Sequence, residues 1–267
     1  ITPRAVLVLS SGKQIDLAES HEQITEQNGM IVEVDSSGEI RYQRTDLQSE
    51  EIIYNKVIVP RAGEYSLTLS DGTRVWLNSD SEIRYPVAFG KERRTVFLSG
   101  EAYFEVEKDA ERPFYVVLDG MEVKVYGTSF NVNTHYQGKI LTTLVEGKVG
   151  IRVKSTGTES ILQPNQMAEF NREKEEVEVT DVDPYYYTAW RAGEFVFQNE
   201  TIEEIMDRLC RWYDTEVFYA NDDVRKKRFT GIIARFTDVA DVLHLIGETA
   251  TVQFDLKGDV ITVSDSR

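Results

Sequence analysis

Few residues in this sequence are of a type that could carry chemistry, and they are widely spaced. Cys210 is the only cysteine, and its thiol could act as a nucleophile. It lies beside Leu209 and Trp212 on the apolar side of a helical pattern, with no histidine nearby, which favours a half-buried structural thiol. A single cysteine excludes an intrachain disulfide and a thiolate cluster. A metal site of the common kind is not expected either, because the three histidines are scattered, at His21, His135 and His244.

Three glutamates close together in the sequence are the other catalytic candidates. Glu101, Glu105 and Glu107 could supply the paired carboxylates of a glycoside hydrolase. However, Glu105 and Glu107 alternate with Phe104 and Val106, a pattern typical of the solvent-facing side of a strand. The G-x-S-x-G, H-E-x-x-H, P-loop and dinucleotide-binding motifs are all absent from the sequence. We therefore predict that the protein is not an enzyme and has no catalytic, metal-binding or cofactor-binding residues.

Three segments could bind a partner, and each has a structural alternative. Asn199-Glu200-Thr201 matches a glycosylation sequon but equally suits the start of a helix. The run Arg225-Lys226-Lys227-Arg228 could contact an acidic partner, although basic residues also protect edge strands from aggregation, which is the favoured interpretation. An aromatic segment could form a carbohydrate platform or a partner hot spot, or pack at a domain junction; its residues are Tyr185-Tyr186-Tyr187 and Trp190. No partner-binding residue can be singled out.

Length, composition and charge narrow the class of protein. The 267 residues are 41% hydrophobic, which is enough for a sizeable core and about two domains. Lys and Arg number 30 against 46 Asp and Glu, giving a formal charge of −16. This balance argues against a nucleic-acid binder, which needs excess basic residues to neutralise phosphates, and against simple adsorption to anionic lipid.

The sequence contains no run of about 20 apolar residues that could span a bilayer, and no signal peptide. It opens with Ile1-Thr2-Pro3-Arg4 rather than Met, which suggests a fragment or a processed chain. The parent protein is therefore expected to carry an anchor that is missing here.

The first 182 residues are predicted to form an all-β domain. From Arg4 to about Thr180, short alternating runs are separated by Gly, Asn, Asp and Ser, without a helical period. Glycines precede several of these runs, as at Gly100, Gly127 and Gly147, which suggests stacked hairpins in a solenoid-like or sandwich-like arrangement. The clearest predicted strands are 57–59, 65–69, 74–77, 95–98, 102–106, 114–118, 122–126 and 147–153.

An internal repeat predicts the geometry of two hairpins. Residues 7–17 (LVLSSGKQIDL) match residues 67–77 (LTLSDGTRVWL) at an offset of 60. A two-residue Asp-Gly loop would pair Leu69 with Arg74 and leave Val75 and Leu77 on the opposite face. A three-residue loop ending in a left-handed Gly would pair Leu67 with Val75 and gather the apolar side chains on one face. We predict the three-residue loop in both copies.

The last part of the chain, residues 185–267, is predicted to be a small α+β domain in the order βαββαββ. Thr201 and Glu204 form a capping box, followed by an apolar helical stripe from Ile202 to Tyr213. A second helix starts at Asp238 and ends near Glu248. We expect both helices on one face of a sheet, with Lys257-Gly258-Asp259 turning the last hairpin. The predicted strands are 194–197, 216–219, 228–233, 252–256 and 260–263.

Several ordered motifs resemble the periplasmic part of the FecR family of membrane-bound anti-sigma factors. The motifs are PRAGEY at 60–65, LSDGTRVWLN at 69–78, RTVFLSGEAYFEV at 94–106, PF at 113–114, VYGTSFNV at 125–132, LVEGKV at 144–149 and LQPNQMA at 162–168. The copy at 7–17 is similar to an N-terminal β segment of Bacteroidetes-type members. The C-terminal part is similar to the domain that follows in those members and to the short N-terminal signalling domain of secretins and TonB-dependent transporters; it includes WRAG at 190–193, LCRWY at 209–213 and FTG at 229–231.

The resemblance implies a signalling relay. In this family, a cytoplasmic segment holds an extracytoplasmic-function sigma factor, one transmembrane helix follows, and the periplasmic part receives a signal from the N-terminal signalling domain of an outer-membrane TonB-dependent transporter. Proteolysis then frees the sigma factor. By this resemblance the chain is the periplasmic receiver. The family motifs imply structural roles only: turns at Gly72, Gly100, Gly127 and Gly147, and core packing for Trp76 and Phe104.

The features above place the expected docking site on the C-terminal domain or at its junction with the β region. The motivating observations are the predicted exposed strands near 225–233 and the aromatic segment. The main alternative is a carbohydrate-binding β module with an accessory domain, which requires a solvent-facing aromatic row that includes Trp76 or Tyr103. A glycosidase would require two carboxylates in a pocket. A purely structural envelope protein would lack neighbouring sigma-factor and transporter genes.

Overall fold

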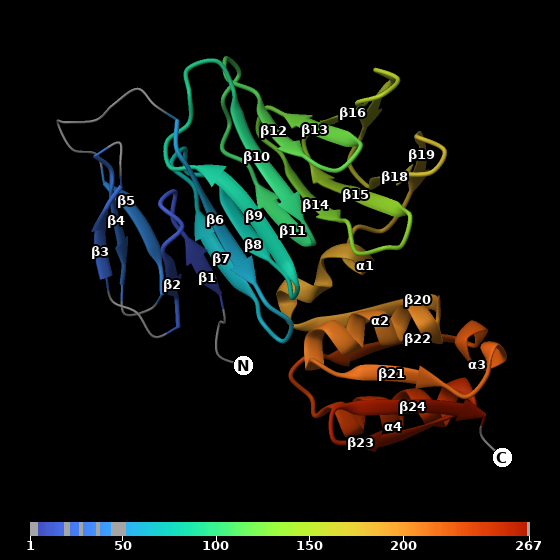
Figure 1. Cartoon of the computed structure of the whole chain (residues 1–267). Coiled ribbons are helices and arrows are strands. Elements are labelled where there is room, and N and C mark those ends of the chain that lie inside the picture. The colour runs from blue at the N-terminus through green and yellow to red at the C-terminus, as the bar shows by residue number, and fades with distance from the viewer. Residues whose placement is uncertain (1–4, 19–21, 27–28, 36–37, 44–51, 266–267) are drawn as a thin grey trace. The chain divides into compact units, whose positions relative to one another are not determined.

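The computed structural model describes residues 5–18, 22–26, 29–35, 38–43 and 52–265, and the chain folds into two compact units (Figure 1). The larger unit comprises Thr2–Pro184 and is built of strands. The smaller unit comprises Tyr185–Arg267 and combines helices with short strands. The fold is therefore mainly β, with a β-rich region followed by a small α+β region, as the sequence predicts.

Two large sheets form most of the larger unit. The nine-stranded sheet contains, in spatial order, β17 (Glu159–Leu162), β16 (Val149–Val153), β13 (Met121–Val125), β12 (Phe114–Val117), β10 (Arg94–Ser99), β9 (Ser81–Pro86), β6 (Tyr54–Val59), β1 (Val6–Val8) and β2 (Gln14–Asp16). The seven-stranded sheet contains β19 (Glu176–Asp181), β18 (Gln166–Asn171), β15 (Lys139–Glu146), β14 (Ser129–Asn133), β11 (Glu101–Glu105), β8 (Arg74–Leu77) and β7 (Tyr65–Thr68).

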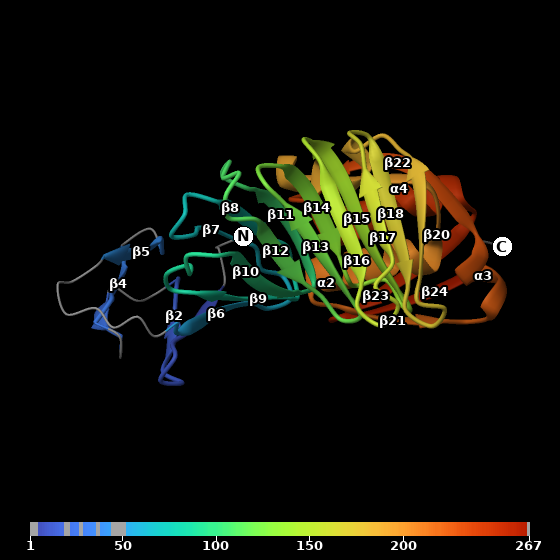
Figure 2. The same ribbon diagram turned by 90° about the horizontal axis from the view of Figure 1, so that it is seen from above.

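Both sheets grow in the order of the chain. After β6, the chain alternates between the sheets and adds one or two strands to each before crossing back. The colours of the strands therefore advance in the same direction along the two sheets (Figure 2). Neighbouring strands are antiparallel except for β10 and β12, which are parallel and are separated in sequence by β11 of the other sheet. This arrangement agrees with the stacked, sandwich-like hairpins expected from the glycine-initiated strands.

A third, smaller sheet belongs to the same unit. It consists of β3 (Glu22–Thr25), β4 (Ile31–Val34) and β5 (Ile40–Gln43), paired in antiparallel fashion. Val32, Val34 and Ile40 join the main hydrophobic core. The Tyr65 hydroxyl donates a hydrogen bond of 2.5 Å to the Gly38 carbonyl oxygen, and the Tyr42 and Tyr85 hydroxyls lie 2.7 Å apart. Tyrosine hydroxyls thus connect this sheet to the larger ones.

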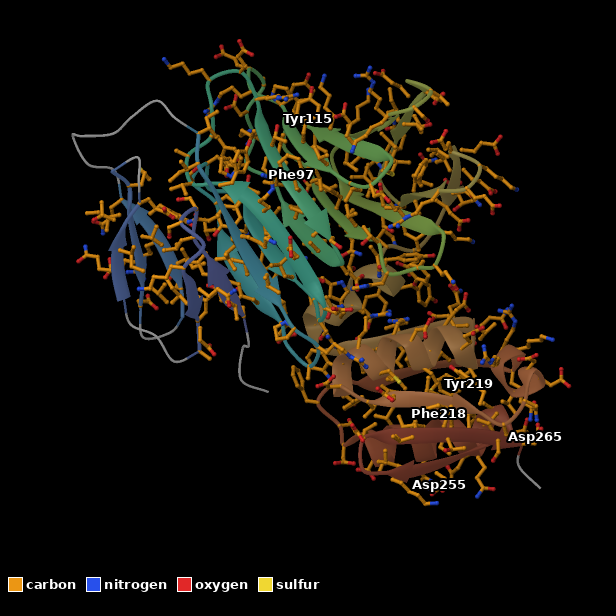
Figure 3. The ribbon with its side chains drawn as sticks, in the orientation of Figure 1. Phe97, Tyr115, Phe218, Tyr219, Asp255 and Asp265 are labelled. Atoms are coloured by element: carbon orange, nitrogen blue, oxygen red, sulfur yellow. The ribbon has the colours of Figure 1, made fainter. Side chains whose placement is uncertain are left out.

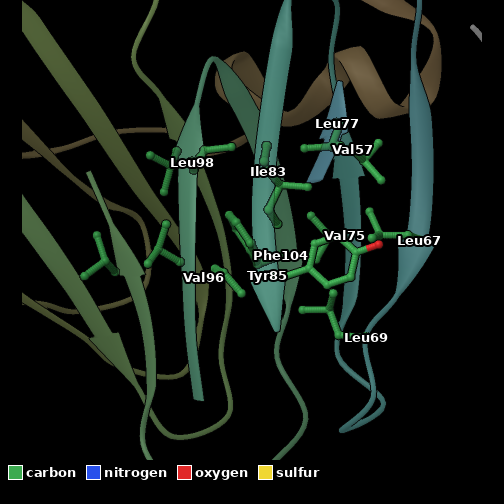
Figure 4. Packing of buried hydrophobic residues seen from close by; sticks show 14 of the residues in the cluster. Val57, Leu67, Leu69, Val75, Leu77, Ile83, Tyr85, Val96, Leu98 and Phe104 are labelled. Carbon is green, nitrogen blue, oxygen red and sulfur yellow. The ribbon is translucent and has the colours of Figure 1, made fainter. Parts of the chain in front are cut away.

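The core of the larger unit lies between the two large sheets, because alternate side chains of each strand point inward. Val57, Ile83 and Val96 of one sheet and Val75 and Phe104 of the other are fully buried. Figure 4 shows these side chains converging from both sides. The outward side chains of the same strands remain partly exposed, so each strand has the half-buried pattern that its sequence predicts.

The two repeated hairpins have the predicted three-residue loop. Tyr65 pairs with Leu77 and Leu67 with Val75, while Leu69 and Thr73 close the loop through a 2.8 Å hydrogen bond. The earlier copy is equivalent, with Leu7 opposite Ile15. Gly72 and Gly12 end the two loops with φ of 91° and 85°, in the left-handed region that favours glycine. The prediction is confirmed in both copies, and Leu69 does not pair with Arg74.

The smaller unit contains two sheets rather than one. β20 (Glu194–Thr201) pairs with β22 (Arg228–Ala234), and β24 (Val260–Asp265) lies between β21 (Glu216–Tyr219) and β23 (Val252–Lys257). Helix α2 (Ile202–Tyr213) contacts β20 and β21, and α4 (Val239–Ala250) contacts β22 and β23. The expectation of helices on one face of a single sheet was wrong, because each helix packs against a strand of both sheets.

The helix starts predicted at Thr201 and Asp238 are confirmed, but the sequence did not predict the short helices. Thr201 caps α2, and its backbone N–H donates to the Glu204 carboxylate at 2.9 Å in the expected capping box. Asp238 caps α4 without a capping box; its carboxylate accepts a hydrogen bond from the Ala240 N–H at 2.9 Å. The sequence did not predict three one-turn elements: α1 (Tyr185–Thr188), the 3-10 helix η1 (Ala189–Ala192) and α3 (Asp222–Lys226). The last hairpin turns through Gly258 and Asp259 alone, since Lys257 pairs with Val260.

None of the helices formed by the described residues combines the length and the apolar character needed to cross a membrane.

Candidate partner-binding interface

The residues considered for catalysis lie apart and have structural partners. Cys210 is buried on α2 in the core of the smaller unit, which confirms the structural interpretation. Glu101 accepts hydrogen bonds from the side-chain amides of Asn78 and Asn131, at 2.7 and 3.0 Å. Glu105 pairs instead with Arg74, and Glu107 is exposed beyond the end of β11. These three carboxylates therefore show no common arrangement for acid–base chemistry.

The two histidines that the structure describes do not gather either. His244 is exposed on α4 beside Glu248, at 3.4 Å, whereas His135 follows β14 in the other unit. His21 lies outside the described residues. Within the described ranges, no three His, Cys, Asp or Glu side chains come together as metal ligands would.

Only the last residue of the basic run lies in an edge strand, so the favoured interpretation applies to Arg228 alone. Arg225 and Lys226 lie in the last turn of α3, Lys227 caps that helix, and only Arg228 begins β22. Arg225 pairs with Glu203 at 3.0 Å, and Lys227 pairs with Asp265 at 2.7 Å. Because these charges face carboxylates of the same unit, they hold its elements together.

The aromatic segment divides between core and surface. Trp190 is buried, and the Arg235 guanidinium lies over its ring at 5.8 Å and over the Trp212 ring at 3.6 Å. Tyr185 remains 42% exposed on α1. Trp190 is thus a structural residue of the smaller unit, and the segment does not present a continuous aromatic platform.

The pair Trp76 and Tyr103 was the test for a carbohydrate-binding face. The two are opposite each other on β8 and β11, with ring centroids 5.9 Å apart. Tyr103 is buried, while Trp76 is only half-buried and lies below the Arg74 guanidinium. Phe104 is a core residue as expected, but Trp76 is not, because it points to the face opposite Val75 and Leu77. The aromatic face that the carbohydrate-binding alternative requires is therefore not open at Tyr103.

The strongest candidate for a partner-binding surface is the open edge of β21. This strand pairs only with β24 among the described strands, in parallel register. The Glu216 N–H donates to the carbonyl oxygen of Asp259, just before β24, and the Ala220 N–H donates to that of Val263 on β24. Since alternate residues of a parallel strand point their backbone groups to opposite sides, those of Val217 and Tyr219 face the open edge.

Phe218 gives this edge an apolar anchor. Its side chain is 58% exposed on the outward face of the sheet, opposite Thr262, which in turn lies opposite Asp255 (Figure 3). The neighbouring Val217 and Tyr219 instead point inward and pack against the core. A large exposed ring beside unpaired backbone groups and polar neighbours matches the make-up of protein-binding hot spots.

The second sheet of this unit also exposes apolar side chains. Ile232 on β22 and Phe236 just after it are each 61% exposed. A β-bulge at Gln198 and Asn199 interrupts the pairing of β20 with β22, and Asn199 has a φ of 51°. The sequon residues thus form a bulge and a helix start, in agreement with the structural interpretation.

Comparisons with known proteins identify both units. Residues 55–150 match the family described as FecR protein, and residues 194–263 match the family described as FecR, C-terminal. No protein with a curated description matches the chain.

Solved structures agree with this assignment. A crystal structure at 1.65 Å resolution of a candidate anti-sigma factor from Parabacteroides distasonis is 28% identical, with a TM-score of 0.72 over 79% of this chain and 99% of that one. A second structure, at 2.50 Å, is also described as a candidate anti-sigma factor from that organism; it is 27% identical, with a TM-score of 0.73 over 80% and 100% of the two chains. Because the two family matches together span more than half of the sequence and each falls within one structural unit, the chain belongs to the FecR family of anti-sigma factors.

Proposed function

We propose that the chain is the periplasmic receiver of a membrane-bound anti-sigma factor, which relays a signal from an outer-membrane TonB-dependent transporter to an extracytoplasmic-function sigma factor. The parent protein is anchored by one inner-membrane helix, and its cytoplasmic segment holds the sigma factor. The role is regulatory and requires no catalytic step. Membership of the FecR family supports this proposal.

The observation that carries the proposal is the open β21 edge with its exposed Phe218. A receiver needs a surface that recognises another small folded domain, and an unpaired strand edge provides directional hydrogen bonds for that purpose. The transporter's N-terminal signalling domain adds a strand along residues Glu216–Tyr219 and covers the Phe218 ring. Backbone pairing supplies affinity, and the aromatic anchor fixes the position of the partner.

Calorimetry with the signalling domain of the transporter encoded beside this protein tests the proposal. Phe218→Ala should weaken binding at least tenfold, as expected for the loss of an aromatic hot spot. The fold should be unaffected, because the ring is exposed and outside the core. Leu245→Ala is the matched control: Leu245 is 47% exposed on α4, and its loss should leave the affinity unchanged.

Two results would contradict this placement. Equal affinity of the Phe218→Ala variant and the original chain would remove β21 from the interface. Unchanged binding after deletion of residues 185–267 would remove the whole C-terminal unit. The absence of a sigma-factor gene and a transporter gene from the neighbourhood would instead favour a structural envelope protein.

A further inference from the structure

Gly150 is the second of the five residues of β16, inside the strand, where a glycine weakens the strand and contributes no packing. Its φ lies outside the left-handed region, so the backbone does not require glycine. A Cβ at this position would meet only ordinary van der Waals contacts, the nearest being the Lys124 carbonyl oxygen at 3.6 Å. Neither conformation nor crowding explains the missing side chain. A glycine of this kind often marks a place where a ligand approaches the sheet.

The missing side chain leaves a groove on the outward face of the nine-stranded sheet. The groove has a volume of about 550 Å³, within the range of small-molecule sites. Gly150 lies opposite Lys124 of β13 on one side and opposite Ile161 of β17 on the other. Tyr115 and Tyr126 line the groove next to Lys124. Figure 3 shows Tyr115 on this sheet, close to Phe97 of the neighbouring β10.

Lys124 is held in place by the two tyrosines. Its Nζ atom lies 5.8 Å from the ring centroid of Tyr115 and 5.4 Å from that of Tyr126. Hydrogen bonding to Tyr126 raises the pKa of Lys124, so the ammonium remains charged at neutral pH. Among the residues that the structure describes, no carboxylate forms an ion pair with Lys124. Its charge is therefore available to a ligand.

The groove carries more positive than negative charge, although the chain as a whole has a charge of −16. The cations lining it are Lys124, Lys148 and Arg152, against the carboxylates of Glu122 and Glu159. Arg152 faces Glu122 at 3.7 Å, a long distance that leaves most of its donors accessible. The local excess of cations favours an anionic ligand.

The chemistry of the walls narrows the class of ligand further. The floor strands β13 and β16 are paired on both sides, so an extended peptide has no free backbone groups to bind there. The walls instead offer tyrosine rings, against which a flat apolar face of a ligand can stack. They also offer hydroxyl, ammonium, guanidinium and carboxylate groups, which can form hydrogen bonds with the ligand. A saccharide presents C–H faces and hydroxyls, and an acidic saccharide adds the negative charge.

We propose that the groove over Gly150 binds an anionic oligosaccharide that carries carboxylate or sulfate groups. This site is on a different unit from the β21 edge and does not depend on the proposed relay. It also differs from the surface around Trp76 and Tyr103, which belongs to the other large sheet.

Calorimetry of the whole chain with three probes tests this proposal. The probes are trigalacturonate as the carboxylated ligand, a heparin-derived tetrasaccharide as the sulfated one, and maltotriose as the neutral one. At least one acidic probe should bind at least tenfold more tightly than maltotriose. The acidic probe that binds more tightly shows whether the groove prefers carboxylate or sulfate groups. No binding of either acidic probe, or equal binding of maltotriose, would overturn the proposal.

Two variants locate the site. Gly150→Thr should place a branched side chain on the floor of the groove and reduce affinity for the acidic probe at least tenfold, while leaving the melting temperature unchanged or higher. Lys124→Gln should also reduce affinity for the acidic probe at least tenfold, because it removes the central cation. Lys139→Gln is the matched control, because it removes the same charge from β15 on the other sheet and should leave binding unchanged. Full affinity in both Gly150→Thr and Lys124→Gln would place the ligand elsewhere and contradict the inference.

Discussion

At the level of single residues, Arg94 and Asp71 form a buried ion pair that explains two of the family motifs. The Arg94 guanidinium lies 2.7 Å from the Asp71 carboxylate, and their side chains are 0% and 4% exposed. Arg94 also donates to the Glu107 and Arg112 carbonyl oxygens, both at 2.9 Å. Asp71 accepts hydrogen bonds from the backbone N–H and the hydroxyl of Thr73. These contacts attach the second repeated hairpin to β10, so this part of the motif pattern serves folding.

Replacement of Arg94 by Ala should lower the free energy of unfolding by about 3–5 kcal/mol, because it leaves Asp71 buried without its cation. The matched control is Arg74→Ala, since Arg74 pairs with Glu105 but is 62% exposed. The control should change the free energy of unfolding by about 0–1 kcal/mol. Urea denaturation measures both. Similar losses in the two variants would mean that burial does not distinguish the pairs.

The Tyr42 and Tyr85 pair predicts how stability depends on alkaline pH. Burial raises the pKa of Tyr42 to about 12, against about 10 in an unfolded chain. The unfolded state therefore loses its proton first, so stability is unaffected below pH 10 and falls as the pH rises from 10 to 12. A shift of this size corresponds to roughly 2–3 kcal/mol.

Tyr42→Phe should reduce this alkaline loss of stability, because the variant has no hydroxyl to titrate at that position. Tyr126→Phe, at a 46% exposed position, serves as the control. Denaturation curves at pH 9 and 11.5 provide the comparison. If both variants lose stability as steeply as the original chain, burial of the Tyr42 hydroxyl is not the cause.

At the level of elements, Gly72 and Gly150 show opposite uses of glycine in a strand-rich unit. Gly72 needs its left-handed backbone to close the hairpin loop, so Gly72→Ala should cost about 1–2 kcal/mol. Gly150 has no such requirement, so Gly150→Ala should be neutral or stabilise by about 0.5–1 kcal/mol. Thermal unfolding of the two variants checks the contrast. A large loss in Gly150→Ala would reveal a structural role and weaken the case for a ligand groove.

The sequence predicted most elements of the fold because their signals are local. The hairpin loops follow from where the apolar residues fall around Gly12 and Gly72, and the start of α2 follows from Thr201 and Glu204. The pairing of strands in the smaller unit could not be predicted, since periodicity defines a strand but not its neighbour. Helix α3 has only five residues, too few for a helical period, and its basic end was therefore taken for a strand edge.

The candidate sites were harder to predict for a related reason. Val217, Phe218 and Tyr219 are all apolar, so alternation could not show which of them faces solvent. Gly150 was visible within a predicted strand, but its importance depends on Lys124 and Ile161, which come from other strands. Trp76 was taken for a core residue because aromatic residues are usually buried, yet its neighbours Val75 and Leu77 occupy the inward positions. Cross-strand neighbours and exposure become known only from the fold.

At the level of the whole molecule, each unit has a core of its own. The core of the larger unit and that of the smaller unit share no residues, and the sequence passes between them near Pro184. We therefore expect residues 2–184 and 185–267 to fold when expressed separately, as independent domains do. Cooperative thermal unfolding of each fragment by circular dichroism would confirm this. A fragment without a cooperative transition would show that its core needs the other unit.

The central claim is that the smaller unit receives a partner domain at the open edge of β21, and hydrogen–deuterium exchange tests it most directly. The measurement compares the whole chain with and without the transporter's signalling domain. The Val217 and Tyr219 amides face the open edge and should exchange quickly in the free chain, then slow strongly on binding. Slowed exchange confined to the larger unit, or none in residues 216–219 at saturating partner, would contradict the claim.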